Sequence, residues 1–189
     1  IGATANISLN LGKGNRPTAE KLLGNAFTLS IIVGLAIAIV GTICANPILN
    51  LFGASENTLF YAKEYLNIIL LGCTFNILSF SLNSTVRADG NPKMSSFTMV
   101  IGCGTNIILD YVFIFILNLG VKGAALATII SQAITFFIIL YYYTAGNSNL
   151  KLKVENFKLK KHLVTMTFAI GIAPFATQIA NSLVQVIAN

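Results

Sequence analysis

The chain has 189 residues, of which 55% are hydrophobic and only 10% are charged, and its net charge is +6. Soluble domains carry about a quarter charged residues, so a mean hydropathy of +0.77 excludes an ordinary soluble domain and indicates folding in a lipid bilayer. The basic excess does not indicate binding to nucleic acid, because Lys and Arg lie between apolar segments and form no single basic face.

Five apolar segments are each longer than the roughly 20 residues that a helix needs to cross about 30 Å of hydrocarbon. In chain order they are residues 22–55, 65–86, 94–121, 123–150 and 162–189. They contain no Lys, Arg, Asp or Glu except Asp110. Helices of a soluble bundle would each show a charged outer face. The pattern therefore predicts five membrane-spanning helices, preceded by the end of an earlier helix near Leu11.

Polar connections containing Gly, Pro and Asn separate the predicted helices. The first, third and fifth connections, residues 12–21, 87–93 and 144–162, contain 10 Lys and Arg residues, whereas the second and fourth contain 2. By the positive-inside rule, the first set is predicted to be cytoplasmic.

The longest connection is predicted to separate two membrane lobes. Residues 1–143 would then be first-lobe helices, residues 144–162 a basic cytoplasmic linker, and residues 163–189 the first helix of a second lobe. Because the sequence starts at Ile1 and stops inside an apolar segment, we expect it to be part of a longer chain.

Asp110 is the only acid inside an apolar segment. A charged Asp at the centre of a membrane helix costs about 2.5–3.5 kcal/mol, so such groups usually face protein or water. Asn106, four residues earlier, lies on the same helical face. Counted at 1.5 Å per residue from the turn near Gly120, Thr128 lies at nearly the same depth as Asp110. These three side chains are predicted to bind H⁺ or Na⁺; the alternative is a protonated Asp110 that hydrogen-bonds a neighbouring helix.

Signatures of other functions are missing from the sequence. No Lys or Arg lies deep in a predicted helix, which disfavours an anion site at the membrane centre. No HExxH, GxSxG, P-loop or CxxC motif occurs, and no paired His or second acid accompanies Asp110. We therefore expect no enzyme, and no cofactor other than a coupling ion.

Several segments, taken in order, resemble the first lobe of the multidrug and toxic compound extrusion (MATE) transporters. They are LGKGN, NPILNLFGAS, RADGNPK, NIILDYVFIF and GVKGAALATIISQ, at residues 11–15, 46–55, 87–93, 106–115 and 120–132. The resemblance covers nearly the whole chain. It implies an all-α, polytopic transmembrane bundle that runs from the end of helix two to helix seven of twelve.

The resemblance also implies a function. The protein would be a multi-pass antiporter of the plasma membrane that exports cationic or amphipathic small molecules in exchange for Na⁺ or H⁺, acting with the second lobe of its own chain. An alternative is a lipid-linked oligosaccharide flippase of related fold, which would be expected to place cationic residues in its cavity.

A set of ion ligands is implied as well. The family's first-lobe cation site combines an Asp on helix one with positions that match Asn106, Asp110, Thr128 and Asn83 in this chain, and Na⁺ would be held by the first three. The helix-one Asp lies outside this sequence. Counted from the turn at residues 87–93, Asn83 would lie about 20 Å nearer the cytoplasm than Asp110.

Overall fold

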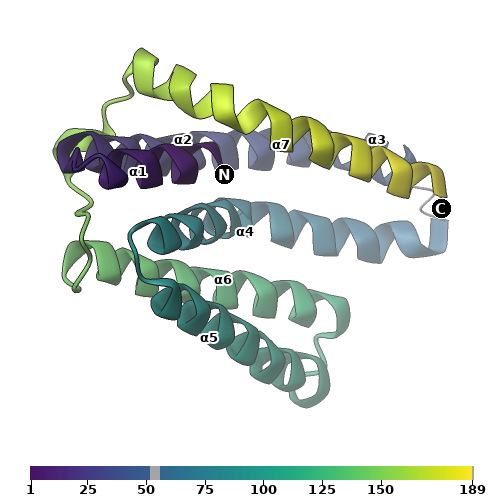
Figure 1. The fold of residues 1–189 in the computed structure, drawn as a ribbon. Coiled ribbons are helices and arrows are strands. Elements are labelled where there is room, and N and C mark those ends of the chain that lie inside the picture. Colours follow the sequence, from purple (N-terminus) through teal and green to yellow (C-terminus); the bar gives the residue numbers. More distant parts are fainter. Residues whose placement is uncertain (52–55, 189) are drawn as a thin grey trace.

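The computed structural model describes residues 1–51 and 56–188, and Figure 1 shows them as a bundle of helices. No strand occurs within these residues, so the prediction of an all-α fold is confirmed. In chain order the described helices are α1 (Gly2–Gly12), α2 (Arg16–Ile43), α3 (Ala45–Leu51), α4 (Glu56–Ala88), α5 (Pro92–Asp110), the π-helical η1 (Tyr111–Ile116), α6 (Gly120–Thr144), the 3-10 helical η2 (Val154–Phe157) and α7 (Lys161–Ala188).

Five segments of the described chain are long and apolar enough to cross a bilayer, as predicted. They are Arg16–Ile43, Thr58–Ala88, Pro92–Ile116, Gly120–Thr144 and Lys161–Gln185. The third span joins α5 to η1, and α1 is the earlier helix expected near Leu11. Residues 52–55, at the end of the first predicted apolar segment, lie outside the described residues.

The α1–α2 and α4–α5 turns are built in the same way. In each, an Asn side chain, that of Asn15 or Asn91, caps the following helix by accepting a hydrogen bond from the backbone N–H three residues later. A proline occupies the first turn of each helix. Gly14 and Gly90 have φ values of +71° and +90°, which side-chain-bearing residues rarely adopt. These local signals fix where α2 and α5 begin.

The three basic connections lie at one end of the bundle. Glu20 in α2 forms an ion pair with Lys153 at 3.0 Å, and Asp89 of the α4–α5 turn accepts a hydrogen bond from the backbone N–H of Leu150 at 2.8 Å. At the opposite end, Lys122 in α6 pairs with Glu64 in α4 at 2.8 Å. The chain therefore runs up and down as the alternating charges predicted, and Figure 1 shows the same arrangement.

α4 is the central helix, with α2 packed on one side and α6 on the other. Small residues allow the helices to approach closely. A Cβ on Gly34 of α2 would lie 2.8 Å from the Cα of Thr74, and one on Gly72 of α4 would lie 2.3 Å from Ile129.

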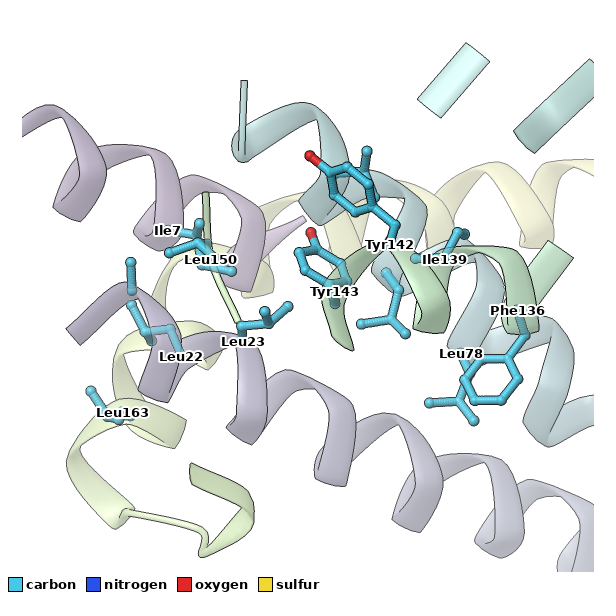
Figure 2. Packing of buried hydrophobic residues seen from close by; sticks show 13 residues of the cluster. Ile7, Leu22, Leu23, Leu78, Phe136, Ile139, Tyr142, Tyr143, Leu150 and Leu163 are labelled. Atoms are coloured by element: carbon cyan, nitrogen blue, oxygen red, sulfur yellow. The ribbon is translucent and has the colours of Figure 1, made fainter. Parts of the chain in front are cut away.

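The buried apolar cluster extends to the end of the bundle where the connection between α6 and α7 lies. Figure 2 shows Ile7, Leu22, Leu150 and Leu163 grouped at one end of this cluster, and Leu78 and Phe136 at the other. Leu150 comes from the connection between α6 and α7, and its side chain is fully buried. The packing of the bundle therefore includes residues of a connecting segment.

Candidate functional site

A cavity of about 440 Å³ lies between α4, α5 and α6, and most of its lining side chains are polar. From α4 it is lined by Asn76, Ser79, Phe80, Asn83, Ser84 and Arg87; from α5 by Met99, Gly102, Cys103 and Asn106; and from α6 by Thr128, Ser131, Gln132 and Thr135. The α4 residues extend over eleven positions, which corresponds to about 16 Å along the helix axis. The cavity is therefore elongated along the membrane normal.

The helical spacing of the lining residues explains why they face one cavity. On α6, Thr128, Ser131, Gln132 and Thr135 follow an i, i+3, i+4, i+7 pattern, which places them on one face. The residues that α4 and α5 contribute follow the same spacing. This polar stripe is a readable signal in the sequence, but the sequence-based prediction used only Asn106, Thr128 and Asn83 from it.

Close contacts between α5 and α6 fix their relative register. A Cβ on Gly102 would lie 2.6 Å from Oγ1 of Thr135, and one on Gly123 would lie 3.0 Å from the backbone of Phe113. α5 and α6 are antiparallel, and these two contacts place Asp110 opposite residues 126 and 127 of α6. Asp110 is therefore one or two residues, about 3 Å along the helix axis, from the level of Thr128. The two side chains share one depth in the membrane.

Asp110 and Asn106 each carry a buried polar atom that has no hydrogen-bond partner among the described residues, 1–51 and 56–188. These atoms are Oδ1 of Asp110 and Nδ2 of Asn106. Buried polar groups are nearly always paired, so each such atom calls for a ligand or another explanation. The hydroxyl of Thr128 donates to the carbonyl oxygen of Ala124 at 2.9 Å, which leaves its oxygen lone pairs able to accept.

The sequence-predicted residues occupy different parts of this region. Asn106 and Thr128 line the cavity, whereas Asp110 lies one helical turn beyond Asn106 and is not among the lining residues. Asn83 also lines the cavity, but its amide oxygen accepts a short hydrogen bond from the hydroxyl of Ser95. Ser95 precedes Asp110 by fifteen residues, about 22 Å along α5. Asn106, Thr128 and Asn83 thus line one cavity, with Asn83 near the end away from Asp110. Asp110 lies one turn beyond Asn106, close to the depth of Thr128.

Arg87 corrects one sequence-based expectation, which assigned this residue to the connection at residues 87–93. α4 runs to Ala88, so Arg87 lies in its last turn and lines the cavity. Its guanidinium donates to the hydroxyl of Ser84 at 3.4 Å. The assignment to a connection was wrong because a charged residue next to a turn sequence looks the same in a helix end as in a loop. The long side chain of Arg87 extends back along α4.

A π-helical turn begins directly after Asp110. In η1, the backbone N–H of Leu117 bonds to the carbonyl of Val112, five residues earlier, where an α-helix would use the fourth. Single π-turns inside helices often mark functional sites. Nothing in the sequence pattern indicated this turn.

The donor set around Asp110 fits a small cation or a proton. A carboxylate, an amide and a hydroxyl supply oxygen atoms, which suit hard cations, whereas imidazole and thiolate ligands suit transition metals. Within residues 1–51 and 56–188, no group of three or more His, Cys, Asp or Glu side chains is positioned to hold a metal ion. These oxygen atoms suit a hard cation, and the carboxylate can instead bind a proton.

The chain resembles known proteins in sequence and in fold. The sequence model of the family described as MatE matches residues 1–112. The multidrug export protein MepA of Staphylococcus haemolyticus is 33% identical over 189 residues, which cover 100% of this chain and 42% of MepA. The chain thus spans less than half the length of this curated relative.

Solved structures give the same result. The MATE multidrug transporter DinF-BH, solved in complex with rhodamine 6G, superposes with a TM-score of 0.91 at 35% identity, covering 100% of this chain and 42% of that one. An inward-facing multidrug resistance MATE family transporter superposes with a TM-score of 0.86 at 25% identity, covering 91% and 39%. The family match, the relative and the shared fold together show that this chain belongs to the MATE family.

Proposed function

We propose that this chain is the first-lobe part of a multidrug antiporter that exports cationic or amphipathic compounds in exchange for Na⁺ or H⁺. The observation that carries the proposal is the buried Oδ1 of Asp110, which has no partner in the described part of the chain and belongs to a residue one turn beyond a polar cavity. An ionisable group inside a membrane is costly and is usually kept for ion or proton movement. MepA and DinF-BH, which the chain resembles, are named as multidrug transporters.

In this proposal, Asp110 holds the coupling ion. Asn106, four residues away on the same face, and Thr128, at the same depth on α6, complete the oxygen ligands if the ion is Na⁺. If the ion is H⁺, the protonated carboxyl becomes a hydrogen-bond donor. Occupancy changes what the α5 side chains can pair with on α6. The packing of these helices therefore differs between the loaded and the empty state.

The available driving force is sufficient for such coupling. Moving one charge contributes about 2.3 kcal/mol per 100 mV, and a proton gradient contributes about 1.4 kcal/mol per pH unit. One coupled ion can therefore sustain at least a tenfold drug gradient. Alternating access requires a second lobe, so transport is proposed for the full-length protein.

The spans and the basic connections support a location and an orientation. The family and the five spanning helices make this a membrane protein. We propose the plasma membrane, with the connections at residues 12–21, 87–93 and 144–162 on the cytoplasmic side, because these three carry most of the Lys and Arg residues.

The test is drug efflux from liposomes that contain the full-length protein, loaded with ethidium or a rhodamine dye and exposed to a Na⁺ or pH gradient. We expect Asp110→Asn to abolish gradient-driven efflux while leaving membrane insertion intact. Glu155→Gln removes the same charge from an exposed acid of η2 and should leave efflux unchanged. Unchanged efflux by Asp110→Asn would refute the coupling role. Transport of a lipid-linked oligosaccharide in place of the drugs would establish the flippase alternative.

A further inference from the structure

Of the predicted linker at residues 144–162, residues 145–160 lie between α6 and α7 in the structure. They are folded against the first lobe, and the name linker refers to them from here on. Asp89 of the α4–α5 turn is 2% exposed and receives two backbone N–H groups of the linker. Its carboxylate accepts from the N–H of Asn149 at 3.0 Å and of Leu150 at 2.8 Å, and from the hydroxyl of Tyr142 at 2.7 Å. The side-chain amide of Asn149 donates in return to the backbone carbonyl of Asp89 at 2.7 Å.

Asn25 of α2 forms a second attachment further along the linker. Its side chain is 2% exposed, its Oδ1 accepts from the N–H of Lys160 at 2.9 Å, and its Nδ2 lies 3.3 Å from the carbonyl oxygens of Asn156 and Lys158. The neighbouring helix surface is shaped for this approach, because a Cβ on Gly24 would lie 2.5 Å from the Asn156 carbonyl oxygen.

Further contacts lie between and around these two attachments. Glu20, 8% exposed, pairs with Nζ of Lys153 at 3.0 Å. The ring of Phe157 stacks on Phe27 of α2, with ring centroids 5.0 Å apart. The hydroxyl of Thr28 donates to the carbonyl of Phe157 at 2.9 Å. The contacts thus extend from residue 149 to residue 160.

Opening the attachment at Asp89 would remove two of the groups that hold its carboxylate. In the described part of the chain, no Lys or Arg forms an ion pair with Asp89. Two of the three groups that donate to its carboxylate belong to the linker. Hydrogen bonds to a charged group stabilise more than hydrogen bonds between neutral groups, and opening would exchange two of them for bonds to water. This favours a linker that stays attached.

We propose that Asp89 and Asn25 are positioning residues of the transport cycle. They hold the linker on the first lobe so that residues 145–160 move as one rigid body with α2 and α4. The two lobes then move relative to each other beyond Met166, because the first turns of α7 also contact the first lobe through Leu163 and through the Met166 carbonyl, which accepts from the side-chain amide of Asn6. The part of the proposal that concerns the cycle rests on the proposed transport function. The attachment itself does not.

The test measures hydrogen-exchange rates of the linker amides in the full-length protein in liposomes. The rates in the wild-type protein are compared with those in Asp89→Asn, Asn25→Ala and the control Glu155→Gln. In the wild-type protein we expect slow exchange at Asn149, Leu150 and Lys160. Asp89→Asn leaves one accepting oxygen where the carboxylate had two, and should accelerate exchange at the first two amides roughly 10- to 100-fold. Asn25→Ala should accelerate exchange at the Lys160 amide by a similar factor. Because the two variants test separate attachments, one remains informative if the other fails to fold.

Two further readouts separate a positioning role from a merely structural one. Linker exchange in the wild-type protein should be as slow during drug turnover as at rest. Both variants should lower the maximal efflux rate several-fold while leaving the affinity for the rhodamine dye unchanged, whereas Glu155→Gln should alter neither quantity.

Three results would overturn the proposal: unprotected wild-type linker amides, faster linker exchange during turnover, or equal acceleration by Glu155→Gln. Unaltered efflux rates in variants with accelerated exchange would remove the positioning role. Slow exchange in a wild-type protein that moves no drug would instead refute the transport function and leave the attachment intact.

Discussion

α5 crosses α6 at Gly102, and this contact sets which residues of the two helices lie opposite each other. The position of Asp110 relative to Thr128 depends on it. In Gly102→Ala, the new Cβ would lie 2.6 Å from Oγ1 of Thr135 and 3.8 Å from its Cβ. The hydroxyl is held by a hydrogen bond to the carbonyl of Ser131 at 2.9 Å, so it cannot rotate away freely. Overpacking of this kind costs about 1–3 kcal/mol.

A double-mutant cycle isolates the contact. Thr135→Ala removes the clashing oxygen, and the next atom at 3.8 Å is at ordinary contact distance. The double variant should therefore recover most of the stability lost in Gly102→Ala, with a coupling energy of about 1–2 kcal/mol. Gly104→Ala is the matched control, because no heavy atom of the described residues lies within 4 Å of its Cβ position. Replacing Gly by Ala inside a helix by itself stabilises the helix by up to about 1 kcal/mol.

The assay is the free energy of unfolding of the full-length protein in micelles, measured by SDS titration. We expect Gly102→Ala to be less stable than Gly104→Ala by at least about 1 kcal/mol. Equal stability of these two variants, or additive effects in the cycle, would mean that α5 and α6 do not cross at this point. The derived depth of Asp110 would then be wrong.

Two further predictions concern the other contacts of α6. Gly123→Val places a Cβ 3.0 Å from the backbone of Phe113, which has little freedom to move, so we expect a loss of about 1–3 kcal/mol in the same unfolding assay; unchanged stability would contradict the close α6–η1 approach. Lys122→Gln breaks the ion pair with Glu64; the two side chains are 50% and 24% exposed. The loss in free energy of unfolding should therefore be less than about 1 kcal/mol, and smaller still in high salt. A larger, salt-independent loss would show that the pair is shielded from solvent.

The sequence predicts the membrane fold well because its signals are local. Long uncharged segments define the spans, and the Asn and Gly residues of the RADGNPK turn define where α5 begins. The predicted depth of Asp110 is counted at 1.5 Å per residue from the turn and does not allow for the π-helical η1, which lies between Asp110 and that turn.

Other features depend on tertiary contacts that a single sequence does not encode locally. The π-turn after Asp110 has no composition of its own, and the run that forms it reads as ordinary apolar helix. The linker reads as a basic, polar connection, yet buried groups on distant helices, such as Asp89 and Asn25, bind its backbone. Backbone atoms carry no sequence signal, so this docking was not predictable.

The measurement closest to the central claim is infrared difference spectroscopy of the full-length protein, recorded while pH or Na⁺ concentration is varied. We expect a carboxyl band that changes with H⁺ or Na⁺ and that is lost in Asp110→Asn but retained in Glu155→Gln. If the same ion-dependent band persists in Asp110→Asn, another group binds the coupling ion, and the coupling role proposed for Asp110 is wrong.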